Sequence, residues 1–157
     1  MYNIRSATIN DIDAIHALVS ESIYELCKDF YTKEELDAYL SSFPKIAHYN
    51  ELLSDRIIIV ACDNETIVGY TQYDPSDSTV DAIYVLPSYT GKGAGSHLLR
   101  YIEDVARSLK KSEIKISSSV NAVSFYEKEN YIFQENFFQT CKDGTKFESA
   151  KLKKQLH

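Results

Sequence analysis

The chain has 157 residues, of which 44% are hydrophobic and 25% are charged. These values are typical of one compact globular domain and exclude disordered, collagen-like and repeat proteins. The formal net charge of −6 argues against a nucleic-acid partner, which would favour a basic surface, and suits cationic ligands. We therefore expect a single domain over residues 1–157.

The cysteines predict neither a disulfide nor a metal site. Cys27, Cys62 and Cys141 lie far apart and form no CxxC or Cys/His cluster, so each is expected to be a small buried residue and no metal is expected. Residues 1–5 do not resemble the start of a signal peptide, and no apolar stretch is long enough to cross a bilayer. The sequence predicts a cytoplasmic protein with no membrane partner.

The first part of the chain predicts a strand followed by a pair of helices. The strand covers residues 2–6. Apolar residues then recur at three- and four-residue steps, as on one face of a helix: Ile12, Ile15, Val19, Ile23 and Leu26. Thr32 and Glu35 have the spacing of a capping box, which predicts that a second helix begins there and runs toward Pro44.

A meander of three strands is expected next. The apolar and β-branched runs at 56–61, 66–73 and 79–85 are separated by turn-forming residues. Their short connections predict antiparallel pairing.

The second half of the chain predicts a crossover and a closing hairpin. An amphipathic helix is expected to bury Leu98, Ile102, Val105 and Leu109. A strand at 113–118 follows and should run parallel to the strand before the helix. A short helix at 122–128 then leads to strands at 131–138 and 147–153. The predicted fold is α/β, with a mixed, mostly antiparallel central sheet flanked by helices, and an exposed edge at the closing strands would permit a homodimer.

A glycine-rich segment joins the third meander strand to the amphipathic helix. Three of the five glycines lie at 91–95. Free backbone N–H groups and the helix dipole favour an anion there, and glycine lets a ligand approach the main chain. The sequence therefore predicts a pyrophosphate site, at which Lys92 either contacts phosphate or is only solvated.

Two familiar nucleotide motifs do not fit this loop. A Walker A motif needs Ser or Thr after its lysine, whereas Gly93 follows Lys92. A dinucleotide fingerprint would need glycine where Ser96 stands. A nucleotide-binding switch is therefore a minor alternative.

Two segments resemble the GNAT superfamily of N-acetyltransferases. The Val-x-Pro sequence at 85–87, the loop from Gly93 to Ser96 and the helix after it are similar to that family's acyl-CoA-binding motif. The segment 119–128, with its Phe-Tyr-Glu-Lys run, is similar to the second motif. The resemblance covers nearly all of the chain. It implies direct transfer of an acetyl group from acetyl-CoA to an amine, without a metal or a covalent enzyme intermediate.

The resemblance also implies which residues bind acetyl-CoA. They are Val85, Leu86, Thr90, Gly91, Lys92, Gly93, Ala94, Gly95, Ser96, Ser119, Asn121 and Tyr126. Thr90 stands where the family usually has Gln or Arg, which weakens the hold on phosphate. The family's Asn at the head of the second motif falls on Ser119, so either Ser119 or Asn121 makes that contact. Asn130 replaces a glycine, a change that Asn tolerates because it also adopts the left-handed conformation.

The catalytic candidates follow from the same resemblance. Tyr126 would donate a proton to the departing CoA thiolate, or else it simply packs. A backbone N–H near Val85 or Leu86 would meet the thioester oxygen. Asp81 is the best-placed carboxylate to accept the ammonium proton, although a water chain would also serve. Aromatic residues of the helical pair could line an amine pocket or the core: Phe30, Tyr31 and Tyr39.

An alternative to an enzyme is a non-catalytic module that binds or senses acyl-CoA. Thr90 and Ser119 are compatible with this alternative, because both depart from the family's usual residues. The sequence does not choose among a peptide N-terminus, a lysine, a polyamine, an amino acid and an aminoglycoside as acceptor.

Overall fold

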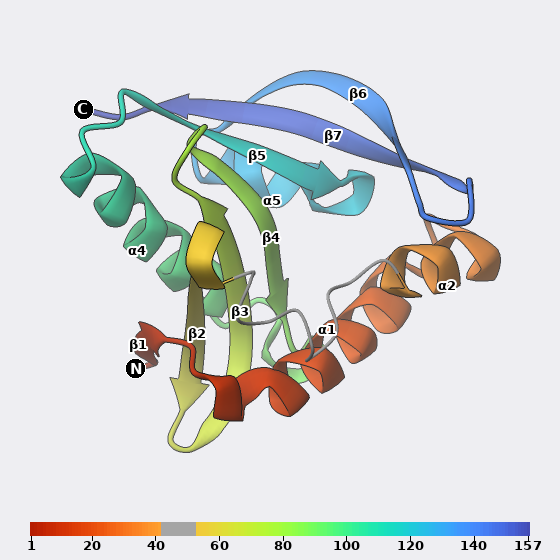
Figure 1. The fold of residues 1–157 in the computed structure, drawn as a ribbon, viewed down its shortest axis with the longest axis horizontal. Coiled ribbons are helices and arrows are strands. Elements are labelled where there is room, and N and C mark those ends of the chain that lie inside the picture. The colour runs from red at the N-terminus through yellow and green to blue at the C-terminus, as the bar shows by residue number, and fades with distance from the viewer. Residues whose placement is uncertain (42–52) are drawn as a thin grey trace.

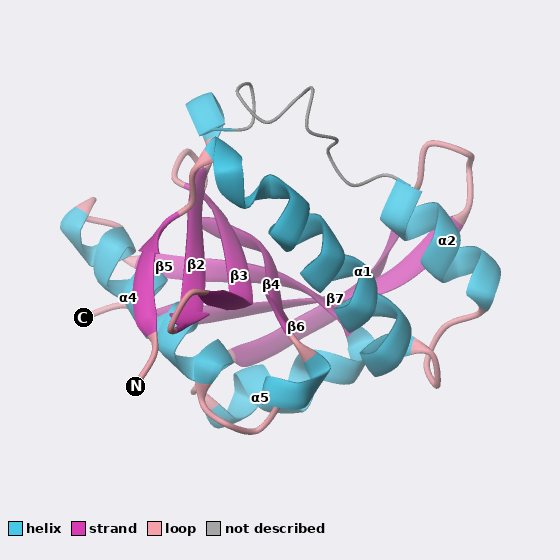
Figure 2. Ribbon diagram, turned by 90° about the horizontal axis from the view of Figure 1, so that it is seen from below, coloured by secondary structure: helices cyan, strands magenta, loops and turns pink. Residues whose placement is uncertain are grey.

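The computed structural model describes residues 1–41 and 53–157, which form one seven-stranded sheet with helices on both faces (Figures 1 and 2). The strands are β1 (Asn3–Ser6), β2 (Ile57–Asp63), β3 (Thr66–Asp74), β4 (Thr79–Val85), β5 (Glu113–Ser119), β6 (Ile132–Thr140) and β7 (Lys146–Gln155). The helices are α1 (Ile12–Cys27), α2 (Lys33–Ser41), α4 (Ala94–Ser108) and α5 (Val123–Lys128).

The strand order confirms the predicted mixed sheet. It is β1-β2-β3-β4-β5-β7-β6, and every neighbouring pair is antiparallel except β4 and β5. The crossover through α4 makes β4 and β5 parallel, as the sequence predicted. Because β7 lies between β5 and β6, β6 forms one edge of the sheet, and β1 forms the other. No helix of the described ranges is long and apolar enough to cross a membrane.

The two faces of the sheet carry separate helical layers. Figure 2 shows α1 on one side of the strands and α5 on the other, while α4 covers the same side as α5. The capping box that begins α2 is confirmed: the Thr32 N–H donates to Glu35 at 2.9 Å, and the Glu35 N–H donates to the Thr32 hydroxyl at 3.2 Å. The predicted continuation of this helix toward Pro44 lies outside the described residues. All three cysteines are buried and unpaired, as expected.

The predicted stripe of α4 needs one correction. Leu98 and Ile102 are fully buried and Val105 is half-buried, but Leu109 is 46% exposed. The helix ends at Ser108, so Leu109 does not continue its apolar face. Leu99 and Ala106 fill that side of the core instead.

Strands β4 and β5 pair over a very short length and then separate. The paired residues are Thr79 with Lys115 and Val80 with Ile116. The pairing of β4 with β3 skips Asp81, because Val80 and Ala82 lie opposite consecutive residues of β3. Such a bulge bends its strand and increases the twist. Beyond it β4 turns away from β5, and Figure 1 shows the two strands diverging. The sheet therefore has an opening in its middle.

A buried carboxylate joins β1 to the start of α1. Asp11 accepts hydrogen bonds from the Arg5 guanidinium at 2.7 and 2.9 Å and from the Thr8 N–H at 2.7 Å. The hydrogen bond from Arg5 is the main reason that the pKa of Asp11 falls from 3.8 to about 2, although burial opposes the change. The ionised carboxylate is therefore favoured by folding.

We predict that this carboxylate makes stability depend on pH. Because the folded-state pKa lies below the ordinary value, the stabilisation of about 2 kcal/mol is present at neutral pH and is lost as the pH falls from about 4 to about 2. Asp11→Asn should lower the free energy of unfolding by about that amount at pH 7 and hardly at all at pH 2. Urea unfolding at both pH values measures the difference, with Asp13→Asn, an exposed neighbour, as control. An equal loss at both pH values would contradict the linkage.

Candidate functional site

The glycine loop adopts a backbone that requires glycine at two positions. Gly91 has a φ of +77° and Gly93 a φ of +90°, a region that other residues rarely adopt. Gly93 is also the N-cap of α4 and brings no side chain to that end of the helix. At the start of the helix, the main chain of the loop is therefore not covered by a side chain of its own.

The first turn of α4 presents unpaired N–H groups. The first intrahelical bond runs from the His97 N–H to the Gly93 carbonyl at 3.0 Å. The N–H groups before it, on Ala94, Gly95 and Ser96, have no intrahelical acceptor. Together with the helix dipole, these donors suit an anion.

Neighbouring side chains hold the loop in place. The Tyr2 hydroxyl donates to the Lys92 carbonyl at 3.1 Å, and the His97 ring donates from Nδ1 to the Gly93 carbonyl at 2.7 Å. The Lys92 ammonium lies 5.4 Å from the centre of the Tyr89 ring. Lys92 and Thr90 are both exposed at the rim of the loop.

The structure brings the two sequence motifs into contact. A Cβ added to Gly95 would lie 3.1 Å from Cζ of Phe125 and 3.7 Å from Val85, so a larger residue would push the Phe125 ring away by a few tenths of an ångström. Next to this contact, the Ser96 hydroxyl donates to Glu129 at 2.5 Å. Sequence reasoning missed Glu129, because the two residues are 33 positions apart.

Of the two candidate backbone donors, only one faces the opening. The Leu86 N–H donates to the Val68 carbonyl at 2.9 Å. Val85 lies opposite Gly69. Along an antiparallel strand, successive N–H groups point alternately toward and away from the neighbouring strand. The Val85 N–H therefore points away from β3, toward the side where β4 and β5 separate.

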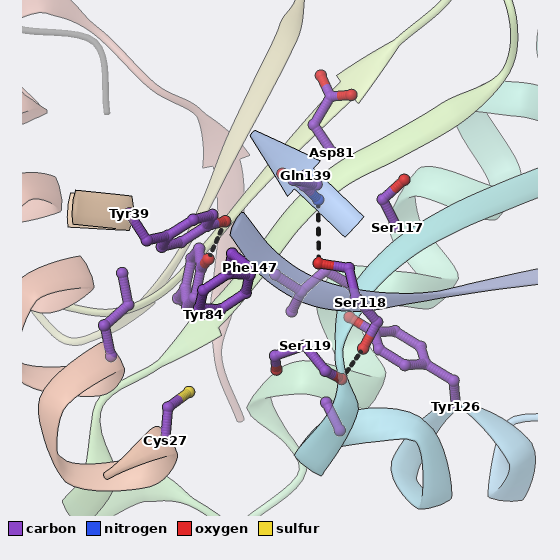
Figure 3. Close-up of a pocket in the computed structure, with 14 residues that line it drawn as sticks. Cys27, Tyr39, Asp81, Tyr84, Ser117, Ser118, Ser119, Tyr126, Gln139 and Phe147 are labelled. Atoms are coloured by element: carbon purple, nitrogen blue, oxygen red, sulfur yellow. Dashed lines mark hydrogen bonds between the residues drawn. The ribbon is translucent and has the colours of Figure 1, made fainter. Parts of the chain in front are cut away.

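A pocket lies beside this opening (Figure 3). Its lining combines the splayed strands with α1, α2, α5 and the closing hairpin. Most of the polar groups are hydroxyls, and Asp81 is the single charged residue of the lining. The lining residues are Ile23, Cys27, Tyr39, Asp81, Ile83, Tyr84, Ser117, Ser118, Ser119, Ala122, Tyr126, Gln139, Phe147 and Ser149.

Tyr126 projects from α5 into this pocket, toward the serines at the end of β5 (Figure 3). It is 4% exposed, and no group of the described residues hydrogen bonds with its hydroxyl. Burial, and to a lesser extent Tyr39, raises the pKa of Tyr126 well above its ordinary value of 10. The phenol therefore stays protonated at neutral pH and can act as a proton donor.

Two further tyrosines meet across the pocket. The hydroxyls of Tyr39 and Tyr84 are 2.7 Å apart (Figure 3). Burial raises the pKa of both phenols. Of the aromatic residues proposed for an amine pocket, Tyr39 lines it, Tyr31 is buried behind it and Phe30 is 59% exposed.

Asp81 lines the pocket but is already engaged. Its Oδ2 accepts hydrogen bonds from Arg56 Nε at 2.8 Å and from Gln72 Nε2 at 3.0 Å. Its side chain is 30% exposed. A cationic amine would therefore meet a carboxylate that a guanidinium already partly neutralises.

The two candidate residues at the head of the second motif, Ser119 and Asn121, lie in different environments. Ser119 lines the pocket, whereas the Asn121 amide donates to the Leu26 carbonyl at 3.1 Å and its Oδ1 is buried without a partner among the described residues. Cys27, which the sequence did not connect with this site, lies beside both side chains, and burial raises the pKa of its thiol. The described ranges contain no cluster of His, Cys, Asp or Glu that could hold a metal ion.

The model of the acetyltransferase (GNAT) family matches residues 20–131. The chain belongs to this family. A protein of Mycobacterium bovis described as an uncharacterized N-acetyltransferase is 26% identical to this GNAT protein over 99 residues, and a counterpart from Mycobacterium tuberculosis with the same description gives the same values. The match covers 60% of this chain and 64% of each relative, less than two thirds of the relatives' length.

Solved structures of GNAT proteins share the fold. A GCN5-related N-acetyltransferase from Rhodopseudomonas palustris superposes with a TM-score of 0.92 at 24% identity, over 99% of this chain and 96% of that one. The PaiA N-acetyltransferase from Thermoplasma acidophilum, in complex with coenzyme A, gives 0.79 at 17% identity over 99% of both chains. A phosphinothricin acetyltransferase from Sinorhizobium meliloti, in complex with acetyl-CoA, gives 0.73 at 18% identity, over 99% and 88%.

Tyr31 holds the second motif against the closing hairpin. Its hydroxyl accepts from the Val120 N–H at 2.8 Å and donates to the Glu148 carbonyl at 2.7 Å. Its ring stacks on Phe147 with the centres 4.1 Å apart, and Tyr39 stacks on Phe147 at 4.6 Å. This stack links α2 to the pocket wall.

We predict that Tyr31→Phe destabilises the protein although it keeps the stacked ring. The change leaves the Val120 N–H and the Glu148 carbonyl without their partner, which costs about 1–3 kcal/mol. Urea unfolding measures the loss. Tyr101→Phe, on the exposed side of α4, is the matched control and should change stability by less than about 0.5 kcal/mol. Equal stability of the two variants would show that the hydroxyl contacts contribute nothing.

Proposed function

We propose that this GNAT protein is an acetyl-CoA-dependent N-acetyltransferase that transfers the acetyl group directly to a primary amine of a small molecule or protein. The observation that carries the proposal is the contact of Gly95 with Phe125. This contact ties the first turn of α4, with its unpaired donors, to α5, which carries Tyr126 into the pocket. Relatives with coenzyme A or acetyl-CoA bound to the same fold support the choice of cosubstrate.

The glycine loop would hold the diphosphate of acetyl-CoA. The N–H groups of Ala94, Gly95 and Ser96 have no intrahelical acceptor, and the segment from Thr90 to Gly93 is bare enough for a bulky ligand to approach. Val85, whose N–H faces the opening, would donate to the thioester oxygen as negative charge develops there. Leu86 would contribute packing rather than a donor, because its N–H is bonded to Val68.

In the transfer step, the amine nitrogen forms a bond to the acetyl carbon while the bond from that carbon to sulfur breaks. Tyr126 gives its proton to the departing sulfur, since the buried phenol is protonated at neutral pH. The nitrogen that has attacked still carries one proton more than an amide, and this proton passes through water to the Tyr126 phenolate and restores the phenol. Before attack the ammonium must lose a proton. We assign this proton to Asp81, which lines the pocket and whose Oδ1 takes part in neither of the bonds to Arg56 and Gln72, or to water beside it. Ser119 or Asn121 would orient the cosubstrate next to Tyr126.

The proposal extends to the whole chain and its assembly. We take residues 1–157 as one catalytic domain with a cytoplasmic location. The edge strand β6 exposes three large apolar side chains, Ile132, Phe133 and Phe138, and a second copy pairing with this edge would form a homodimer.

We predict that binding and chemistry can be removed separately. Gly93→Glu places a side chain at a φ of +90° and a carboxylate at the donor turn, so acetyl-CoA affinity measured by calorimetry should fall at least about 100-fold. Tyr126→Phe should keep acetyl-CoA affinity within about twofold and lower kcat for thiol release, measured against an amine panel, about 100-fold or more. Gly144→Glu, at a φ of +87° in the exposed hairpin turn, is the matched control for backbone strain.

The outcomes separate the candidate functions. A wild-type protein that does not bind acetyl-CoA would refute the proposal as a whole. Tight acetyl-CoA binding without thiol release for any amine would point to the non-catalytic binding or sensing module. Unchanged turnover in Tyr126→Phe would remove the tyrosine from the mechanism while leaving the enzyme in place.

A further inference from the structure

Glu129 brings a carboxylate to the start of α4 from another element. The first turn of α4 contains no acidic residue of its own, and its N-cap is a glycine. Glu129 follows directly after α5, where its N–H is bonded to the carbonyls of Phe125 and Tyr126. Its Oε1 accepts from the Ser96 hydroxyl at 2.5 Å. A negative charge is therefore fixed beside a helix N-terminus, where it interacts favourably with the helix dipole.

This carboxylate makes no ion pair within 4.0 Å among the described residues, although most of the acids that contact other elements do. The loop lysine does not approach it: the Lys92 carbonyl is bonded to Tyr2 and its ammonium lies over the Tyr89 ring. Glu129 thus brings a negative charge that has no ion-pair partner to the turn that is proposed to bind phosphate.

We propose that Glu129 sets the affinity for CoA by occupying the positive end of α4 and repelling the CoA phosphates. This inference rests on the proposed function. The Ser96 N–H belongs to the same residue whose hydroxyl anchors Glu129, so a phosphate on that N–H lies well within a Debye length of the carboxylate, about 8 Å at physiological salt. The charge stabilises the helix end in the free protein and weakens binding of acetyl-CoA and CoA alike, which favours product release.

The test uses Glu129→Gln, which removes the charge but keeps an oxygen that can accept from Ser96. The affinity for CoA, measured by calorimetry at low salt, should rise about 3- to 10-fold, and the gain should shrink as salt is added. S-acetylpantetheine, which carries no phosphate, should show no change in KM. The melting temperature of the free variant should fall by roughly 1–3 °C, because the helix end loses its partner charge.

Two further variants make the test specific. Glu127→Gln, on the exposed side of α5, removes the same charge without a contact to α4 and should leave CoA affinity within about twofold of the wild type. In a Ser96→Ala background, Glu129→Gln should give a smaller gain, because the carboxylate is no longer anchored.

Each outcome decides between the two proposals. If the wild type binds CoA and Glu129→Gln binds it no more tightly, the inference is wrong and the proposed function stands. The inference is also wrong if Glu127→Gln gives the same gain, or if the gain appears with S-acetylpantetheine. If the wild type does not bind CoA, the proposed function and the inference fall together.

Discussion

The separation of β4 from β5 is the constraint on which the rest of the site depends. The two strands share only the pairs at Thr79 and Val80, and the bulge at Asp81 then turns β4 away. Backbone groups beyond that point, such as the Val85 N–H, have no neighbouring strand to pair with. Buried donors without a partner are costly, so such an opening is stable only if water or a ligand satisfies them. A sheet that stayed paired would leave no such donors for a ligand.

The opening becomes a site because packing closes its two sides. Phe125 packs on Gly95, and Ser96 is bonded to Glu129, so α5 is tied to the first turn of α4. On the other side, Tyr31 bonds both to the head of the second motif and to β7. The result is that the first turn of α4 and the helix that carries Tyr126 are held by one connected set of contacts, as precise positioning of reacting groups would require.

The electrostatics of the site favour a proton donor more clearly than a base. Burial keeps the phenol of Tyr126 protonated, and burial likewise raises the pKa of Tyr39 and Tyr84. Asp81, the single charged residue that lines the pocket, shares its Oδ2 with Arg56 and Gln72. The pocket thus offers a protonated phenol, as the proposed proton donation to sulfur requires, while the proposed removal of the amine proton would depend on how Asp81 and water share it.

Local patterns in the sequence determined the elements, the crossover and the glycine loop. Each of these patterns involves residues that are close together in the chain, so it can be recognised without knowing the fold. Examples are the periodicity of α1, the capping box of Thr32 and Glu35, and the glycines at 91 and 93. The left-handed conformation of Asn130, at a φ of +69°, was also predictable from its residue type. The family resemblance connected the loop with acetyl-CoA and Tyr126 with the leaving group.

Only the tertiary structure decided which of these residues meet. The strand register shows that the N–H of Val85, and not that of Leu86, faces away from β3. The contact with α1 shows that the Asn121 amide is bonded to the Leu26 carbonyl, whereas Ser119 lines the pocket. The tertiary structure also placed Cys27 in the pocket and Glu129 on Ser96, contacts between residues far apart in the chain. Burial, register and charge pairing depend on the arrangement of whole elements, and no local pattern encodes them. The sequence therefore determined which groups were available, and packing determined which of them share a site.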